Sequence, residues 1–208
     1  MRTATPRAGR RAFSMVELLI ALTITATLLA ATLGALDASF KSYKHTTEGA
    51  STHVVARIVM YRLMSMIRTG SEFGPYPSDP LDATQNPVVS DAIEFVAFDD
   101  EATGQRRIAR IEKRTATDAT RGPFELWYIE TNFSGSTQTS QNSAPMLSNV
   151  QDVRFTLEYD VGPRLTRATV DLTVSPNDVQ DARLHGDMEA PTVRFVSSAC
   201  PRRLEEAE

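Results

Sequence analysis

The sequence predicts an α+β protein in which one long N-terminal helix packs on an antiparallel β-sheet. A continuous apolar segment covers residues 13–36, and an amphipathic helical pattern follows over residues 37–69. Period-two alternation of apolar and polar residues marks two neighbouring strands within residues 153–174. The expected organisation is a basic segment at residues 1–12, the two halves of the helix, and a connector with a sheet over residues 70–208.

The overall composition fits one folded domain with an added element, and it argues against nucleic-acid binding. The chain has 208 residues, 41% hydrophobic and 23% charged, with a net charge of −4, whereas nucleic-acid-binding domains are usually basic. Residues 1–12 contain no acid and four arginines, namely Arg2, Arg7, Arg10 and Arg11. Without them the chain keeps 18 basic and 26 acidic residues, a net charge of −8. Such asymmetry is typical of a protein that meets a membrane.

The segment 13–36 is long enough and apolar enough to cross a bilayer. About 20 apolar residues span a hydrocarbon core of ~30 Å, and Glu17 is the only charged residue in the segment. Threonine hydroxyls are expected to bond back to carbonyl groups one turn earlier; these are Thr23, Thr25, Thr27 and Thr32. Because arginines precede the segment, we expect its start to stay in the cytoplasm and the rest of the chain to lie outside.

Three interpretations of this segment compete, and Glu17 separates them. A secretory signal peptide has a shorter apolar core that ends in a small-residue cleavage site. A plain membrane anchor explains the length and orientation but not an acid at the fifth residue of the apolar run. An acid within a membrane span normally has a partner. The next basic residue is Lys41, about 36 Å further along a helix.

Cleavage between Ala12 and Phe13 supplies the missing cation. The new ammonium group on Phe13 then lies four residues before Glu17, a spacing that allows contact within one helix. A contact between staggered neighbouring helices also satisfies both charges, and it fixes the axial register of the neighbours. The third interpretation is therefore a processed segment that assembles with others of its kind.

The residues around this position resemble the class III signal of type IV prepilins and type II secretion pseudopilins. Residues 9–12 are Gly-Arg-Arg-Ala, and residues 13–17 are Phe-Ser-Met-Val-Glu. The resemblance implies removal of a basic leader by a prepilin peptidase, N-methylation of Phe13, and filament assembly through the N-terminal helix with Glu17 at the fifth mature position. Ala12 departs from the family pattern, in which glycine is typical.

The resemblance also implies the lollipop shape of pilins, a single pass through the inner membrane, and a periplasmic C-terminal domain. The helix is expected to end at Thr69-Gly70, and Gly49 with Ser51-Thr52 permits a bend. Its second half is expected to turn one apolar face to the sheet, at spacings that include Val54, Ile58, Tyr61, Met64 and Ile67.

The remaining chain is predicted to be mostly β-structure. Residues 70–91 are expected to form an irregular connector, and residues 132–145 a polar loop. Strands are expected at residues 92–98, 108–114 and 124–131, followed by a hairpin that turns at Gly162-Pro163 and a final strand at residues 192–196.

The pattern of residues 146–159 and the strand after it resembles J-type minor pseudopilins and W-type minor pilins. The favoured function is a minor pseudopilin of a type II secretion system, placed in a periplasmic filament or at its tip. The alternative is a minor pilin of a type IV pilus or a competence filament. The region after the helix is large for a repeating shaft subunit, which favours a tip position.

The sequence contains no constellation typical of an enzyme, a cofactor site or a metal site. His45, His53 and His185 are scattered. Asp99-Asp100-Glu101 is expected to be a solvated turn, with calcium binding as the less favoured alternative. The methionines of the second half-helix are expected to fill the core; they are Met60, Met64 and Met66. Cys200 is the only cysteine and is expected to be a free thiol, with an intermolecular disulfide as the less favoured alternative.

Overall fold

The computed structural model describes residues 14–118, 121–162, 164–175 and 192–202, without the side chains of residues 44, 45, 48 and 49. The chain divides into two compact units, Met1–Thr46 and Thr47–Glu208. We call them the N-terminal unit and the sheet unit. The predicted lollipop outline concerns how such units are placed relative to each other, so it stays a prediction.

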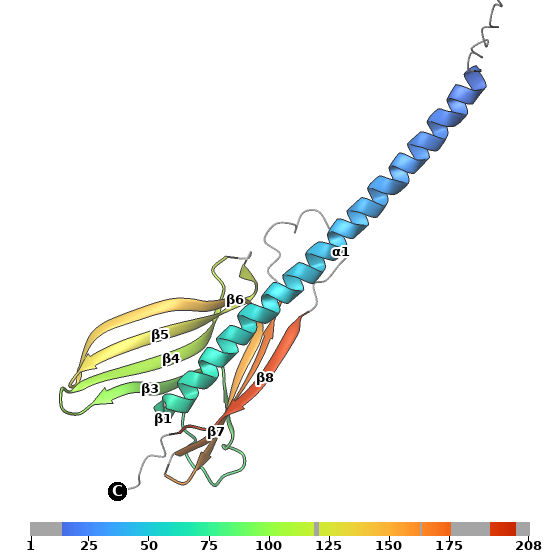
Figure 1. Cartoon of the computed structure of the whole chain (residues 1–208). Coiled ribbons are helices and arrows are strands. Elements are labelled where there is room, and N and C mark those ends of the chain that lie inside the picture. The colour runs from blue at the N-terminus through green and yellow to red at the C-terminus, as the bar shows by residue number, and fades with distance from the viewer. Residues whose placement is uncertain (1–13, 119–120, 163, 176–191, 203–208) are drawn as a thin grey trace, which may run out of the picture. The chain divides into compact units, whose positions relative to one another are not determined.

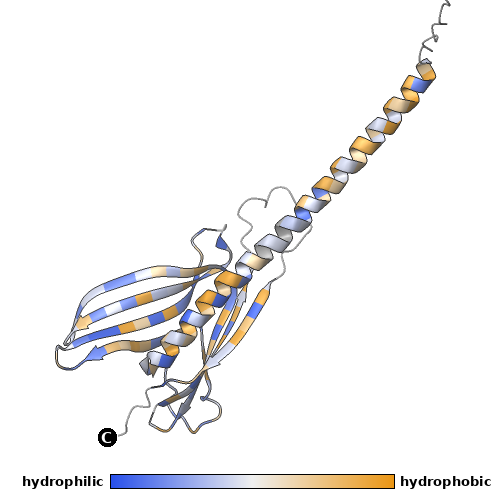
Figure 2. Ribbon diagram, in the orientation of Figure 1, coloured by the Kyte–Doolittle hydropathy of each residue, from blue (hydrophilic) through white to orange (hydrophobic). Residues whose placement is uncertain are grey.

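Helix α1 runs from Met15 to Thr69, in agreement with the predicted helix over its described length. No residue of non-helical conformation interrupts it at the predicted weak point near Ser51-Thr52. Residues Met15–Tyr43 are long and apolar enough to cross a membrane, and none of that span is buried within the chain. Figure 2 shows the hydrophobic colouring that dominates this half of α1.

The sheet unit contains one antiparallel sheet in the order β1-β3-β4-β5-β6-β7-β8, with β2 added beside β6 (Figure 1). From β3 to β8, each strand is adjacent in the sheet to the next strand along the chain, as is common for antiparallel sheets. The strands are β1 Ser71–Gly74, β2 Val88–Ser90, β3 Ala92–Asp100, β4 Gln105–Thr115, β5 Phe124–Ser134, β6 Thr137–Asp160, β7 Arg164–Val174 and β8 Val193–Ala199.

The second half of α1 covers one face of this sheet and forms the core with it (Figure 1). Six helical residues at spacings of three and four are buried: Ala56, Val59, Met60, Leu63, Met64 and Ile67. They pack with inward-facing residues of the strands, among them Phe95, Phe155 and Leu172. The expectation that methionines fill this core is confirmed, because Met60 and Met64 are buried and Met66 packs against the cluster.

The predicted sheet-facing side of α1 was partly wrong. Val54, Ile58 and Tyr61 are 58%, 61% and 70% exposed, whereas Met64 and Ile67 face the core as expected. The second half-helix has two apolar stripes, and successive residues rotate by about 100° around an α-helix. Spacing alone therefore did not identify which stripe the sheet covers.

The predicted strands are present, but the polar loop predicted at residues 132–145 is wrong. Strand β5 continues to Ser134, a turn follows at Gly135, and β6 begins at Thr137. Gly135 has a φ of +60°, a conformation that costs glycine little. The first nine residues of β6 are all exposed, so this segment has no buried face and no apolar alternation for a sequence pattern to detect.

The connector at residues 70–91 is irregular over most of its length, but it includes the short strands β1 and β2. Asn86 holds it against the sheet. Its side-chain Nδ2 donates to the carbonyl oxygens of Pro80 and Tyr159, both at 2.7 Å, and its Oδ1 accepts from the N–H of Tyr159 at 3.0 Å. One amide side chain thus satisfies backbone groups from two distant segments.

Substitutions at two positions of α1 test which stripe stabilises the sheet unit. We expect Leu63→Ala to lower the free energy of unfolding by about 2–5 kcal/mol, because Leu63 is fully buried and its loss leaves a cavity. Ile58→Ala is the matched control on the exposed stripe, with an expected change within about 0.5 kcal/mol. Denaturant unfolding of the detergent-solubilised chain, followed by the fluorescence of Trp127, measures both. Equal losses for the two variants contradict the assignment of the buried face.

Candidate functional site

The start of α1 places the predicted assembly residue in the first helical turn. The N–H of Leu18 donates to the carbonyl oxygen of Ser14 at 3.1 Å, which closes the first α-helical hydrogen bond. The Glu17 carboxylate turns back and accepts from the N–H of Ser14 at 3.4 Å. This contact is the returning arm of a capping box, in which a serine is followed by glutamate three residues later.

The position of Glu17 is electrostatically favourable within its own helix. The first turn carries unpaired N–H groups and the positive end of the helix dipole, and an acid there is stabilised. Glu17 is the acid of that first turn. The negative charge of Glu17, which would be costly in lipid, therefore lies at the end of the helix where the dipole stabilises an acid.

The threonines of the N-terminal unit bond back to the helix as predicted. Thr23 Oγ1 donates to the carbonyl oxygen of Ile20 at 2.9 Å, and Thr32 Oγ1 donates to that of Leu29 at 2.9 Å. Thr25 and Thr27 make equivalent bonds. Each hydroxyl is satisfied without a partner from outside the helix, so the polar side chains are compatible with a lipid environment.

The nearest basic residue after Glu17 is already engaged elsewhere. Lys41 Nζ lies 2.7 Å from the carboxylate of Asp37, one turn earlier on α1. The separation of about 36 Å between Glu17 and Lys41 follows from the helical rise. Within the described part of the N-terminal unit, Glu17 has no basic side chain as an ion-pair partner.

Charged side chains of the sheet unit are largely paired with one another. Arg110 Nε and Arg114 Nε each lie 2.6 Å from the carboxylate of Glu112 on the same strand, β4. Partial burial opposes the charge on Glu112, but the hydrogen bonds from the two arginines outweigh it and hold the pKa of that carboxyl below its ordinary value. Groups held in this way stabilise the sheet surface and are poorly placed for acid–base chemistry.

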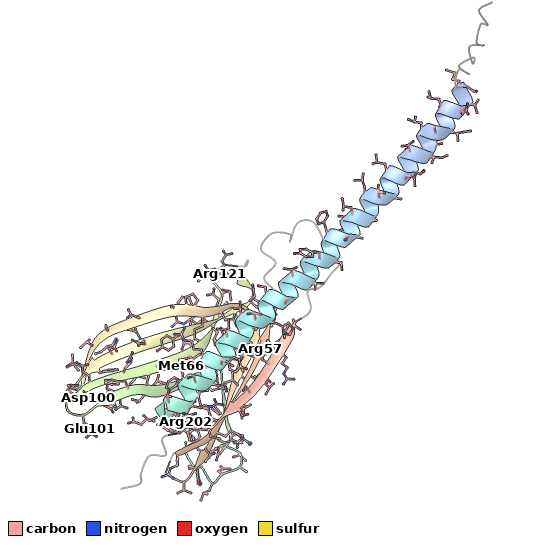
Figure 3. The ribbon with its side chains drawn as sticks, viewed as in Figure 1. Arg57, Met66, Asp100, Glu101, Arg121 and Arg202 are labelled. Atoms are coloured by element: carbon pink, nitrogen blue, oxygen red, sulfur yellow. The ribbon has the colours of Figure 1, made fainter. Side chains whose placement is uncertain are left out.

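One buried carboxylate has a structural explanation. The Glu125 side chain is 1% exposed, and it accepts from Arg121 Nη1 at 3.2 Å and from Trp127 Nε1 at 3.0 Å. A buried charge is tolerated when it is paired and hydrogen-bonded. Arg121 lies on the loop between β4 and β5, so this pair ties the loop to the sheet (Figure 3).

The acidic segment at residues 99–101 lies at the turn between β3 and β4, as predicted. Asp100 Oδ1 accepts from the N–H of Ala102 at 3.1 Å, and its Oδ2 accepts from Thr103 Oγ1 at 2.7 Å. The hydrogen bond from Thr103 holds the pKa of Asp100 below its ordinary value against the opposing effect of desolvation. In the described ranges, no three His, Cys, Asp or Glu side chains are grouped to hold a metal ion.

The histidines and the cysteine do not gather into a site within the described residues. His53 packs edge-on against the ring of Phe195, with 5.7 Å between ring centroids, and Cys200 is an exposed free thiol. The side chain of His45 and the whole of His185 lie outside the described residues.

The start of α1 is also where the chain matches a known family. Residues 7–33 match the Prokaryotic N-terminal methylation motif. The chain carries a class III signal. A comparison with curated proteins found no match, and a comparison with solved structures found none either.

The class III signal includes the predicted cleavage position, Glu17 and the first turns of the apolar helix. The motif is the signal of type IV pilins and pseudopilins, and it implies processing by a prepilin peptidase and assembly with other pilins. Together with the apolar span Met15–Tyr43 it supports membrane anchoring. The match ends at residue 33, so it carries no information about the sheet unit.

The structure describes only one of the residues predicted to function in this signal. Glu17 lies in the first turn of α1. Ala12 and Phe13, at the predicted cleavage and methylation site, lie outside the described residues, as do the leader arginines Arg2, Arg7, Arg10 and Arg11. Their roles stay predictions.

Ser14 was not among the functional residues predicted from the sequence. The four residues from Ser14 to Glu17 have the serine-to-glutamate spacing of a capping box, and an apolar run follows them. That spacing was available in the sequence, and it predicts both the start of α1 and the partner that Glu17 contacts.

Processing of the class III signal is the first functional test. We expect cleavage between Ala12 and Phe13 and methylation of the new amine, because the match places both residues within the motif. Intact mass of the protein extracted from membranes measures the cleavage and the added methyl group together. A strain that lacks the peptidase is the control and should keep residues 1–12. Retention of those residues in cells with active peptidase contradicts the processing.

Proposed function

We propose that this chain is a minor pseudopilin of a type II secretion system and has no catalytic activity of its own. The observation that carries the proposal is the class III signal at residues 7–33, joined to an apolar span in α1 and followed by a separate sheet unit. In this proposal α1 crosses the inner membrane once, the sheet unit lies in the periplasm, and the processed subunit enters a pilus-like filament.

An assembly role accounts for Glu17 better than an anchored enzyme or receptor does. An acid in the first turn of a spanning helix costs insertion free energy, and a simple anchor gains nothing from it. In a bundle of processed helices the carboxylate meets the Phe13 ammonium of a neighbour, and this pairing sets how far one helix is shifted along the next. The paired charges of the sheet unit are also consistent with a non-catalytic surface.

The size and shape of the sheet unit support a minor position at the filament tip. The unit comprises Thr47–Glu208 and includes eight strands. Strand β6 alone has 24 residues, and its first nine are exposed on both faces. Such bulk hinders the close stacking of a repeating shaft, whereas a tip subunit has one side free. The alternative is a minor pilin of a type IV pilus or a competence filament, whose subunits carry the same signal.

Replacing Glu17 tests the proposed register contact. We expect Glu17→Ala to keep or improve membrane insertion, because a charge leaves the lipid, and to reduce incorporation into filaments. Thr27→Ala is the matched control in the same span, since its hydroxyl bonds only to its own helix. Co-purification with partner pilins from sheared filaments measures incorporation. Normal co-assembly of the Glu17 variant excludes the carboxylate as the register contact.

Deletion of the protein distinguishes the proposed filament from the alternative. We expect the deletion to abolish export of enzymes by the type II system and to leave surface pili and twitching unchanged. The measurements are enzyme activity in the culture medium and counts of surface pili in the same strain, with the wild-type copy restored as the control. Loss of pili with normal secretion rejects the type II assignment in favour of the minor pilin.

A further inference from the structure

The sheet unit has a groove along the flank of α1 that faces β8. Its volume is about 430 Å³, and it is lined by α1 between Arg57 and Arg68 and by β8 around Val196. Exposed Tyr61 and partly buried Phe195 give the groove an apolar lining, and Met60 and Met64, which are 5% and 4% exposed, lie beneath them. Tyr61, which is 70% exposed, stands between the two arginines on the helix.

Two positive charges, Arg57 and Arg68, mark the ends of this groove. Arg57 and Arg68 are exposed, and the lining of the groove includes no carboxylate. Most arginines and lysines of the sheet surface have an acidic partner, as in the pairs Arg167–Glu158 and Arg194–Asp171. Among the described residues neither Arg57 nor Arg68 has one. The groove therefore favours an occupant that is acidic and has at least one apolar side chain.

The same groove borders a free edge of the sheet. β8 pairs with β7 and is the last strand in the sheet order of the described residues. A free edge presents unpaired backbone groups that attract other chains, and folded proteins commonly cover it with a loop or another segment. An occupant of the groove lies against β8 and covers part of this edge.

The chain leaves β8 at one end of the groove. The N–H of Arg202 donates to the carbonyl oxygen of Arg68 at 2.9 Å, which fixes this part of the chain to the last turn of α1. Figure 3 shows Arg202 at that end of the helix and Arg57 further along it, on the side of β8. Residues 203–208 follow Arg202 directly in the sequence.

The length of residues 203–208 matches the groove. Arg57 and Arg68 are eleven positions apart, which is about 16 Å along a helix. An extended segment of six residues spans about 20 Å. The segment contains one apolar residue with an extended side chain, Leu204, and three acids, Glu205, Glu206 and Glu208. Its net charge of −2, with Arg203 included, is opposite to that of the groove.

We propose that residues 203–208 of this chain fold back into the groove between α1 and β8, with their glutamates against Arg57 and Arg68. Leu204 then lies on the apolar lining of the groove near Arg68, and the acids lie further along toward Arg57. The segment acts as a strap that shields the edge of β8. The proposal does not depend on which filament the protein enters.

Disulfide trapping in the full chain tests the strap. In a Cys200→Ser background, Ala207→Cys is combined either with Tyr61→Cys or with Arg62→Cys. The two helical positions are adjacent, but Tyr61 lines the groove and Arg62 lies over the ring of Tyr128 on β5, at 5.7 Å from its centroid. The proteins are oxidised in detergent at low concentration, and the linked peptides are identified by mass.

We expect an intrachain cross-link for Tyr61→Cys that forms at least about fivefold faster than for Arg62→Cys, since one exposed ion pair changes an equilibrium by a factor of up to about 5. Glu205→Gln, Glu206→Gln and Glu208→Gln together, or high salt, should remove most of this difference. Glu101→Gln removes an acid at the distant β3–β4 turn (Figure 3) and is the control for a change in net charge alone. It should leave the difference in cross-linking rate unchanged.

Three results overturn the proposal. Equal cross-linking rates at the two helical positions mean that residues 203–208 do not prefer the groove. Cross-links that join two chains, and fade on dilution, assign the groove to a second copy instead. A preference for Tyr61→Cys that survives both the glutamine substitutions and high salt rules out the arginines as the cause of binding.

Discussion

The packing of the second half of α1 on one face of the sheet is the contact on which the sheet unit depends. The helix contributes six buried residues, and the strands contribute most of the remaining core. An antiparallel sheet with one polar face needs such a cover, because its other face is apolar and is costly to leave in water. The helix therefore supplies both the apolar segment of the N-terminal unit, which is long enough to cross a membrane, and about a quarter of the core residues of the sheet unit.

The end of α1 is fitted closely to this contact. At Gly70 a Cβ atom would lie 2.6 Å from Cδ2 of Phe95 and 3.1 Å from Cζ of Phe73, so only glycine allows the chain to leave the helix this close to the core. The N–H of Gly70 still donates to the carbonyl oxygen of Met66 at 2.9 Å, and Arg202 satisfies the carbonyl of Arg68. Two backbone groups at the end of α1 thus have partners. The N–H of Gly70 is bonded within the helix, and the carbonyl oxygen of Arg68 is bonded by the segment after β8.

An element of this fold was predictable from the sequence where its buried and exposed residues follow a regular apolar and polar pattern. The hairpin of β6 and β7 was predictable, because its residues alternate between the core and solvent. The first part of β6 was not, because both of its faces are exposed and its pairing with β5 is made by backbone groups that any residue supplies. The face of α1 was ambiguous for the opposite reason, since Ile58 and Leu63 are equally apolar and only tertiary packing separates them.

The functional residues divide in the same way. The class III signal is a local sequence feature, so its match at residues 7–33 was predictable from that segment alone. The groove beside β8 was not, because Arg57 on α1 and Val196 on β8 are far apart in sequence and line one groove only after the sheet has formed. Long-range pairing of strands brings such residues together, and no local spacing encodes it.

Glu17 is relevant both to the local structure of its own helix and to the proposed contact between subunits. In the single helix its carboxylate faces the free N–H groups of the first turn and contacts the N–H of Ser14, so the helix itself offsets part of the cost of an acid in lipid. Cleavage before Phe13 would then add an ammonium group at the positive end of the helix dipole, where a cation is unfavourable. Glu17 is the first acid after Phe13 in the sequence, so the same carboxylate would have to compensate this new charge as well. Because one acid cannot fully satisfy the N–H groups of its own helix and an ammonium group at once, a processed subunit would keep unsatisfied charge that a neighbouring subunit could complete. In the proposed assembly, processing would thereby convert a self-sufficient helix start into one that is stabilised by association.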